Sequence, residues 1–125
     1  MARILLIEDE DSLRTMLRET IEHFGHTVIE ARNGKEGLER FQHANADLVI
    51  TDIVMPEMDG LEVLMALRNR QPPVKVIAIS GAQSVEDYLD SARLMGAARV
   101  LLKPFGSEAL MAAINKLLPG DGAPG

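Results

Sequence analysis

The chain has 125 residues, of which 46% are hydrophobic and 26% charged, a balance that is ordinary for one globular domain and excludes a disordered chain. Its formal net charge of -6 argues against direct binding of nucleic acid, which requires a basic patch. There is no cysteine for disulfide or thiolate chemistry, and no apolar run approaches the length of a membrane span or a signal peptide, so we expect a cytoplasmic protein with no membrane contact.

Short apolar runs rich in Ile, Val and Leu recur along the chain and predict five strands. In chain order they are Arg3–Ile7, Thr27–Ile29, Leu48–Thr51, Val74–Ile79 and Val100–Leu102. These runs are almost continuously apolar instead of alternating, which is typical of parallel strands buried on both faces.

Segments with helical spacing separate the runs. In the first of them, the apolar face repeats every three or four residues and ends at Gly25; it comprises Leu13, Met16, Leu17, Thr20, Ile21 and Phe24. The next helix is expected around Gly37–Phe41, and the third from about residue 60 to 70, before Pro72-Pro73. The fourth is expected over 84–96 with Ser84 as its N-cap, and the last runs from a Ser107 cap to about Leu118.

Alternating strands and helices predict an α/β fold with a mostly parallel sheet covered on both faces. In such sheets, ligands bind beyond the carboxyl ends of the strands. Polar residues stand at four of these ends: Glu8 and Asp9 after the first strand, Asp52 after the third, Ser80 at the fourth and Lys103 after the fifth. Each has an ordinary alternative reading, as a helix cap, a turn residue or a solvated lysine, and Glu10 and Asp11 fit the first helical turn.

Taken together, the three carboxylates would repel one another unless a cation lies among them. Lys103 supplies one cation, and hard carboxylate oxygens without His or Cys select Mg²⁺, or Mn²⁺ in its place. His23, His26 and His43 are expected to be solvated residues near helix ends. The set predicts a phosphoryl-transfer site in which Asp52 is the nucleophile and Ser80 donates a hydrogen bond.

Four short motifs in this order resemble the receiver domains of bacterial two-component response regulators. They are Ile7-Glu8-Asp9, Asp52 with Met55-Pro56-Glu57-Met58-Asp59-Gly60, Ala78-Ile79-Ser80-Gly81, and Lys103-Pro104-Phe105. The resemblance implies a flavodoxin-like, doubly wound sheet of five parallel strands in the order 2-1-3-4-5 with five helices. It also implies a receiver domain over residues 1–118, followed by a Gly/Pro-rich tail or linker stub over 119–125.

By the same resemblance, Asp52 accepts a phosphoryl group from a histidine kinase or a histidine phosphotransfer protein. Asp9, Asp52 and the backbone carbonyl of Val54 would ligate Mg²⁺, with Glu8 acting through water. Lys103 would pair with the phosphoryl group, and its bond to Pro104 resembles the cis peptide of the family. Such a protein is not an enzyme beyond its own phosphorylation and slow dephosphorylation.

The chain departs from the family pattern at several positions. Glu8 stands where Asp is commoner, Ser80 replaces the more frequent Thr, and Val100 occupies the position of a switch aromatic. Val54 and Ala82 occupy the positions that tune hydrolysis, and neither side chain can orient an attacking water. We therefore expect a long-lived phosphoryl group and an altered switching route.

The resemblance also implies two docking surfaces. The histidine donor would approach over the first helix, near Ser12, Thr15 and Met16. A downstream protein would bind the surface of the fourth helix, fifth strand and fifth helix. Its candidate residues are Tyr88, Arg93, Met95 and Arg99, and on the last helix Leu110, Ile114 and Leu117 are expected to face the core, with Met111 and Leu118 to one side.

Two other functions stay open at this stage. One is a pseudo-receiver, an interaction module of the same fold that is never phosphorylated. The other is a phosphatase of the haloacid-dehalogenase type, indicated by the Asp9-Glu10-Asp11 spacing after a strand. The phosphatase reading has Leu13 where Thr or Val is expected and leaves Asp52 without a role.

Overall fold

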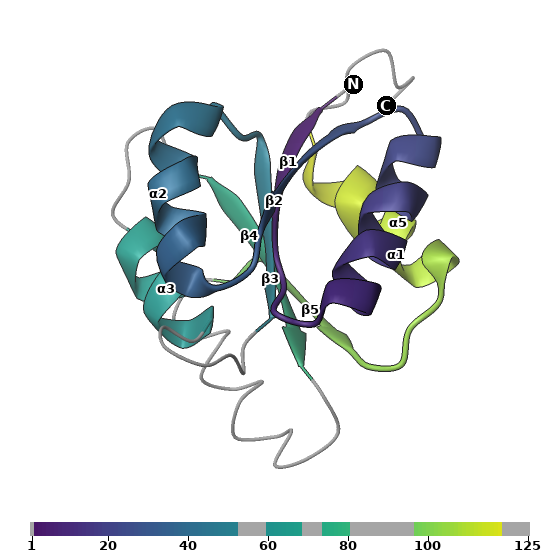
Figure 1. The fold of residues 1–125 in the computed structure, drawn as a ribbon. Helices are drawn as coiled ribbons and strands as arrows, with labels where there is room; N and C mark the ends of the chain where they lie inside the picture. Colours follow the sequence, from purple (N-terminus) through teal and green to yellow (C-terminus); the bar gives the residue numbers. More distant parts are fainter. Residues whose placement is uncertain (1, 53–59, 69–73, 81–96, 119–125) are drawn as a thin grey trace.

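Five parallel strands form one sheet in the order β2-β1-β3-β4-β5, which confirms the predicted fold class and strand order. The structure is a computed structural model that describes residues 2–52, 60–68, 74–80 and 97–118 (Figure 1). The strand bounds are Arg3–Ile7 for β1, Thr27–Ala31 for β2, Leu48–Asp52 for β3, Lys75–Ser80 for β4 and Arg99–Leu102 for β5. Strand β2 is two residues longer than predicted, because Glu30 and Ala31 continue the pairing with Leu6 and Ile7.

Two helices cover each face of the sheet within the described residues. Helices α2 (Gly34–Ala44) and α3 (Gly60–Arg68) lie on one face, and α1 (Asp11–His23) and α5 (Ser107–Leu117) on the other (Figure 1). The helix expected over 84–96 and the tail over 119–125 lie outside the described residues. Among the helices described, none combines the length and apolarity needed to cross a lipid bilayer.

Successive side chains of the central strands enter two separate cores, as the period of a β-strand requires. Ile4 and Leu6 of β1 pack with Leu17 and Ile21 of α1 and with buried residues of α5. Leu5 and Ile7 point to the opposite face and pack with Val63 and Leu67 of α3. The four β1 side chains are 0–1% exposed. Because both faces are buried, the central strands are rigid supports for the polar residues at their carboxyl ends.

The expected apolar face of α1 is only partly correct. Leu17 and Ile21 are buried, but Met16 is 53% exposed and Phe24 is 55% exposed. Met16 lies about 100° around the helix from Leu17, on the flank of the buried stripe. Phe24 lies beyond the helix as its C-cap, where its ring and that of His23 form a T-shaped contact. Gly25 ends the segment with a φ of 95°, as predicted.

Helix α2 begins earlier than predicted because Asn33 caps it. The Asn33 side chain accepts a hydrogen bond of 2.8 Å from the Glu36 N–H, and Glu36 in turn accepts one of 2.9 Å from the Arg32 N–H. The first of these bonds satisfies a backbone donor that the helix start leaves unpaired, and the second holds the residue that precedes the cap. Within the helix, Gly37 packs directly on Ile7, and a Cβ at this position would overlap the Ile7 side chain.

Three further expectations are corrected by the structure. Ser107 is the first residue of α5, and Gly106 is its N-cap, with no side-chain cap hydrogen bond. Met111 is buried in the core instead of lying to one side, because α5 packs with a wide stripe that also includes Ala113. His26 is partly buried and its Nδ1 accepts a hydrogen bond of 3.1 Å from the Ala2 N–H, whereas His23 and His43 are exposed.

Candidate functional site

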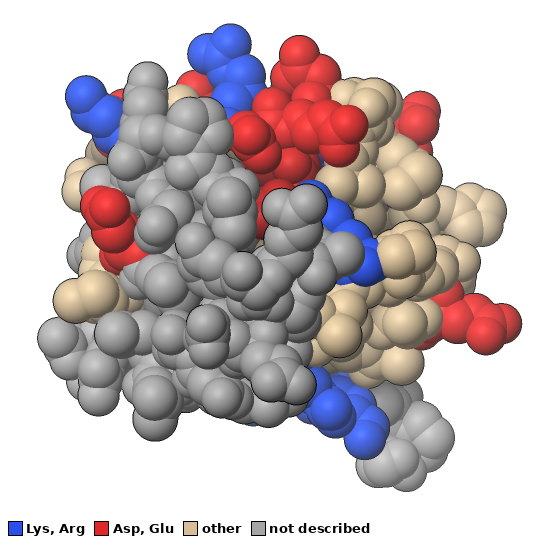
Figure 2. Space-filling view, turned by 90° about the horizontal axis from the view of Figure 1, so that it is seen from below, with Lys and Arg blue, Asp and Glu red and all other residues tan. Residues whose placement is uncertain are grey.

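The carboxyl ends of β1, β3 and β5 bring four predicted side chains to one edge of the sheet. Asp52 is the last residue of β3, Glu8 and Asp9 directly follow β1, and Lys103 directly follows β5. Parallel strands all end at the same edge, so residues far apart in the sequence become neighbours there. Viewed onto this edge, acidic side chains gather in one patch with basic side chains beside it (Figure 2).

A short ion pair connects the carboxyl end of the outer strand β5 with that of the central strand β3. Lys103 Nζ donates a hydrogen bond of 2.8 Å to Asp52 Oδ2 and lies 3.6 Å from Glu8 Oε1. Asp52 is buried, with 4% of its surface exposed. Burial alone would lower the pKa of Lys103, but the hydrogen bond and negative charge of Asp52, together with Glu8, raise it. The lysine therefore stays charged and supplies a positive charge beside both carboxyl groups.

Glu8 is a fully buried carboxyl group, with 0% of its surface exposed. Its Oε2 accepts a hydrogen bond of 3.0 Å from the Glu10 N–H, and its own N–H donates one of 3.0 Å to Ala31 O. Burial raises the pKa of Glu8 to about 8, even though the Glu10 N–H acts to lower it. The charge of Asp52 raises it further, against the opposing effect of Lys103.

The three carboxylates have the geometry of a candidate divalent-metal site. One oxygen from each of Glu8, Asp9 and Asp52 lies within 4.8 Å of the others. Glu8 Oε1 is buried and accepts no hydrogen bond from any described residue. An all-oxygen donor set with such an unsatisfied buried atom fits Mg²⁺, which would complete its shell with waters. When bound, the ion would neutralise negative charge at this edge.

The structure describes some of the other predicted site residues and not the rest. Ser80 is the last residue of β4, paired in register with Leu102, so its backbone reaches the same edge. Val100 is partly buried and packs against the core that contains Val76 and Ala78, not in the site itself. The Lys103–Pro104 peptide bond is cis. Val54 and Ala82 lie outside the described residues, as do Tyr88, Arg93 and Met95.

Two residues that were not predicted lie beside the site: Arg14 contacts the segment that joins β1 to α1, and Glu30 on β2 contacts Arg14. Arg14 on α1 donates a hydrogen bond of 2.9 Å to the carbonyl oxygen of Glu8, and its Nε lies 3.4 Å from Glu30 Oε1. Glu30 is not among the polar strand-end residues from which the site was predicted. The available signal was a charged residue at the end of the strand that neighbours β1, since a partly buried acid there requires a cation.

Comparison with known protein families supports the interpretation of this edge as the site of a receiver domain. Residues 4–115 match the response regulator receiver domain family. The chain belongs to this family. Receiver domains are signalling modules of two-component systems, and this membership removes the support for the phosphatase alternative.

Relatives of similar length include two receiver proteins. The chain is 39% identical over 118 residues to the response regulator receiver protein CpdR of Brucella abortus, covering 94% of this chain and 98% of CpdR. It is 33% identical over 117 residues to the chemotaxis protein CheY of Listeria monocytogenes, covering 93% of this chain and 98% of CheY. A longer relative, the response regulator MprA of Mycolicibacterium vanbaalenii, is 34% identical and is covered over 54% of its length.

Solved receiver structures superimpose closely on this domain. The chemotaxis protein CheY4 of Vibrio cholerae has a TM-score of 0.86 at 29% identity, covering 94% of this chain and 99% of CheY4. A response regulator receiver domain protein from Clostridium thermocellum has a TM-score of 0.85 at 31% identity, covering 94% of each chain. The five-stranded fold is therefore that of a receiver domain.

Proposed function

We propose that Asp52 accepts a phosphoryl group from a histidine kinase or a histidine phosphotransfer protein, in a reaction that depends on Mg²⁺. The observation that carries the proposal is the buried Asp52 carboxylate, 2.8 Å from the Lys103 ammonium and clustered with Glu8 and Asp9. A carboxylate oxygen of Asp52 attacks phosphorus, the P–N bond to the donor histidine breaks, and its electron pair passes to the imidazole. Mg²⁺ or Mn²⁺ would supply electrostatic stabilisation of the phosphoryl oxygens.

The surrounding residues have separate roles in this proposal. Glu8, Asp9, Asp52 and the Val54 carbonyl hold the metal, with Glu8 acting through water. Lys103 and Ser80 contact the phosphoryl group once it is on Asp52. The Lys103 ammonium is already held at the nucleophile, so phosphoryl transfer requires only that it exchange part of its contact with Asp52 for the new oxygens.

The domain would signal through two protein surfaces. The donor would dock over α1, where Ser12, Thr15 and Met16 are all exposed. A downstream protein would dock on the surface formed by the fourth helix, β5 and α5, of which Arg99 at the start of β5 is exposed. The proposed domain spans 1–118, with 119–125 as a tail or linker stub.

Val100 and the hydrolysis-tuning positions Val54 and Ala82 shape the output of the switch. A small aliphatic Val100 has no aromatic ring to turn inward, so switching would proceed through another contact. With no polar side chain at Val54 or Ala82 to orient water, the aspartyl phosphate would be long-lived. A phosphoryl half-life of seconds in the purified protein would refute that last point.

The test is intact mass after incubation with acetyl phosphate and Mg²⁺. The unmodified chain should gain one phosphoryl mass, which Asp52→Asn and chelation should each abolish. Asp47→Asn is the matched control: Asp47 lies directly before β3, at the opposite end of the strand, and bonds the Arg3 N–H at 2.8 Å. No gain, in a folded chain that also fails with a panel of phosphorylated histidine kinases, would favour the pseudo-receiver.

A further inference from the structure

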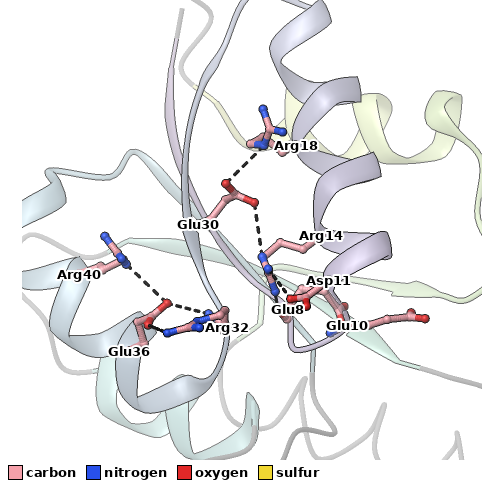
Figure 3. A network of polar contacts seen from close by, with 9 residues as sticks. All are labelled: Glu8, Glu10, Asp11, Arg14, Arg18, Glu30, Arg32, Glu36 and Arg40. Carbon is pink, nitrogen blue, oxygen red and sulfur yellow. Dashed lines mark hydrogen bonds and ion pairs between the residues drawn. The ribbon is translucent and has the colours of Figure 1, made fainter.

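The guanidinium of Arg14 has three polar partners, two on the segment from Glu8 to Asp11 that joins β1 to α1 and one on β2. Its Nη1 donates to the Glu8 carbonyl, its Nη2 donates to the Asp11 carboxylate, and its Nε lies 3.4 Å from Glu30 Oε1 on β2. Only 11% of the Arg14 side chain is exposed. Figure 3 shows this guanidinium reaching from α1 to the acids around it.

These contacts fix both ends of the segment that carries Glu8 and Asp9. Glu8 is the first residue after β1, and Asp11 is the first residue of α1. The peptide plane that includes the Glu8 carbonyl runs from the Cα of Glu8 to the Cα of Asp9, so anchoring this oxygen restricts the directions in which both side chains leave the backbone. Glu8 Oε2 is held further by the Glu10 N–H.

The contact between Arg14 and Glu30 connects this segment to strand β2 of the sheet. Glu30 accepts ion pairs from two successive turns of α1, with Oε1 3.4 Å from Arg14 Nε and Oε2 3.3 Å from Arg18 Nε (Figure 3). Arg18 also pairs with Glu22, at 3.0 Å. Arg18 therefore joins α1 to β2 without contacting the loop, whereas Arg14 joins α1, β2 and the loop.

We propose that Arg14 is a positioning residue for the acidic site: its guanidinium holds the Glu8–Asp11 segment so that the Glu8 and Asp9 carboxylates converge with Asp52. The inference rests on the proposed function, since it assigns a residue that organises the proposed Mg²⁺ site. Arg suits this role because its planar fork presents several donors in fixed directions, which the single ammonium of Lys cannot do.

If Arg14 positions the metal ligands, its replacement should weaken Mg²⁺ binding; if it acts only through its charge, replacement should strengthen Mg²⁺ binding. Measuring the Mg²⁺ affinity therefore distinguishes the two roles. Arg14 is a cation near a cation site, so by Coulomb repulsion alone its removal would tighten Mg²⁺ binding. Loss of a group that orients metal ligands instead weakens binding, typically by about tenfold or more. We expect Arg14→Ala and Arg14→Lys both to weaken Mg²⁺ binding by about tenfold.

Mg²⁺ titration followed by amide NMR measures the affinity without any phosphorylation step. The matched control is Arg18→Ala, which removes the same side chain one turn along α1 and should leave the affinity unchanged. An Arg14→Ala affinity that is unchanged or tighter would overturn the inference, as would full affinity in Arg14→Lys. If the unmodified chain itself binds no Mg²⁺, the proposed function fails instead.

A second readout uses the metal-free chain. Amide hydrogen exchange should accelerate at Glu10 in Arg14→Ala, because Glu8 Oε2 would no longer be held in place to accept from that N–H. Core amides such as those of Leu5 and Ile50 should keep their protection. Uniform acceleration at all of these amides would indicate a merely structural role and would overturn the assignment.

Discussion

Lys103 Nζ lies 2.8 Å from Asp52 Oδ2 although β4 separates the strands that carry the two residues. The lysine therefore reaches across the end of β4 to place its charge on the nucleophile. A side chain in that position stabilises the carboxylates but also competes with any second cation that approaches them.

Replacing Lys103 should reveal this competition. Lys103→Met removes the ammonium from both Asp52 and Glu8, so Mg²⁺ affinity should increase by about tenfold at pH 8, through lost cation repulsion. Phosphorylation by acetyl phosphate should nonetheless slow, because the phosphoryl oxygens lose a counter-charge. Calorimetric Mg²⁺ titration and intact-mass kinetics measure the two effects. Lys116→Met, at an exposed position of α5, is the control and should change neither quantity.

The stability of the metal-free chain should fall as pH rises, because of Glu8. Its folded pKa of about 8 lies above the ordinary value of 4.5, so the folded state retains a proton that the unfolded state releases. The stabilising contribution is complete below the unfolded pKa and is lost as pH rises through the folded pKa near 8. Urea unfolding in chelator at pH 5.5, 7 and 8.5 should show the decline.

The Glu8→Gln chain should lack this component of the decline, because the amide does not titrate. Glu19→Gln, at an exposed position on α1, should keep the pH dependence of the unmodified chain. Equal pH slopes in Glu8→Gln and the unmodified chain would show that another group is responsible.

Asn33 should contribute measurably to the start of α2. Its side chain caps the Glu36 N–H at 2.8 Å, and Asn33→Ala leaves this donor without that partner. We expect a loss of about 1 kcal/mol in the free energy of unfolding, measured by urea titration. Asn115→Ala provides the comparison, since Asn115 is an exposed position within α5, where Ala is the better helix former. If Asn33→Ala were as stable as Asn115→Ala, the cap would contribute nothing.

The contact between Gly37 and Ile7 should be sensitive to one added methyl group. A Cβ at Gly37 would overlap Ile7 Cδ1 and lie 2.7 Å from Cγ1, within a packed core. Gly37→Ala should lower the free energy of unfolding by about 1–3 kcal/mol. Ile7→Val removes Cδ1, so the double variant should be more stable than the sum of the two single changes predicts. If the two changes in the free energy of unfolding simply added, the overlap between Gly37 and Ile7 would not be the source of the destabilisation.

The parts of the site that could be predicted from sequence follow strand topology. Glu8, Asp9, Asp52 and Lys103 each lie at or directly after a strand end, and parallel strands bring such positions to one edge whatever the details of packing. Arg14 and Glu30 were missed because their contact depends on how α1 lies across β1 and β2. A periodic pattern shows which face of a helix is buried, but not which flanking side chains meet the sheet.

The errors on helices have the same origin. Met16 and Met111 are both apolar residues at the flanks of predicted stripes, and they differ only in whether a neighbouring element covers the flank. Met111 packs into the core with Ile114, whereas nothing in the described residues buries Met16. Intrinsic hydrophobicity does not distinguish these cases, because burial is decided by the width of the contact between helix and sheet.

The two-sided burial of β1 has a consequence for how the chain finds its alignment. Because Ile4, Leu5, Leu6 and Ile7 are all large aliphatics, sliding the strand by one residue would exchange its two faces without exposing apolar surface, so hydrophobicity alone specifies the pairing weakly. The polar ends supply the missing information. Asp47 Oδ2 accepts from the Arg3 N–H at one end, and Ala31 O accepts from the Glu8 N–H at the other. A shift by one residue toward the amino end of β1 would move Glu8 to the position of Ile7, away from the Glu10 N–H and Lys103. The acid proposed for metal binding therefore also helps to set the register of the sheet.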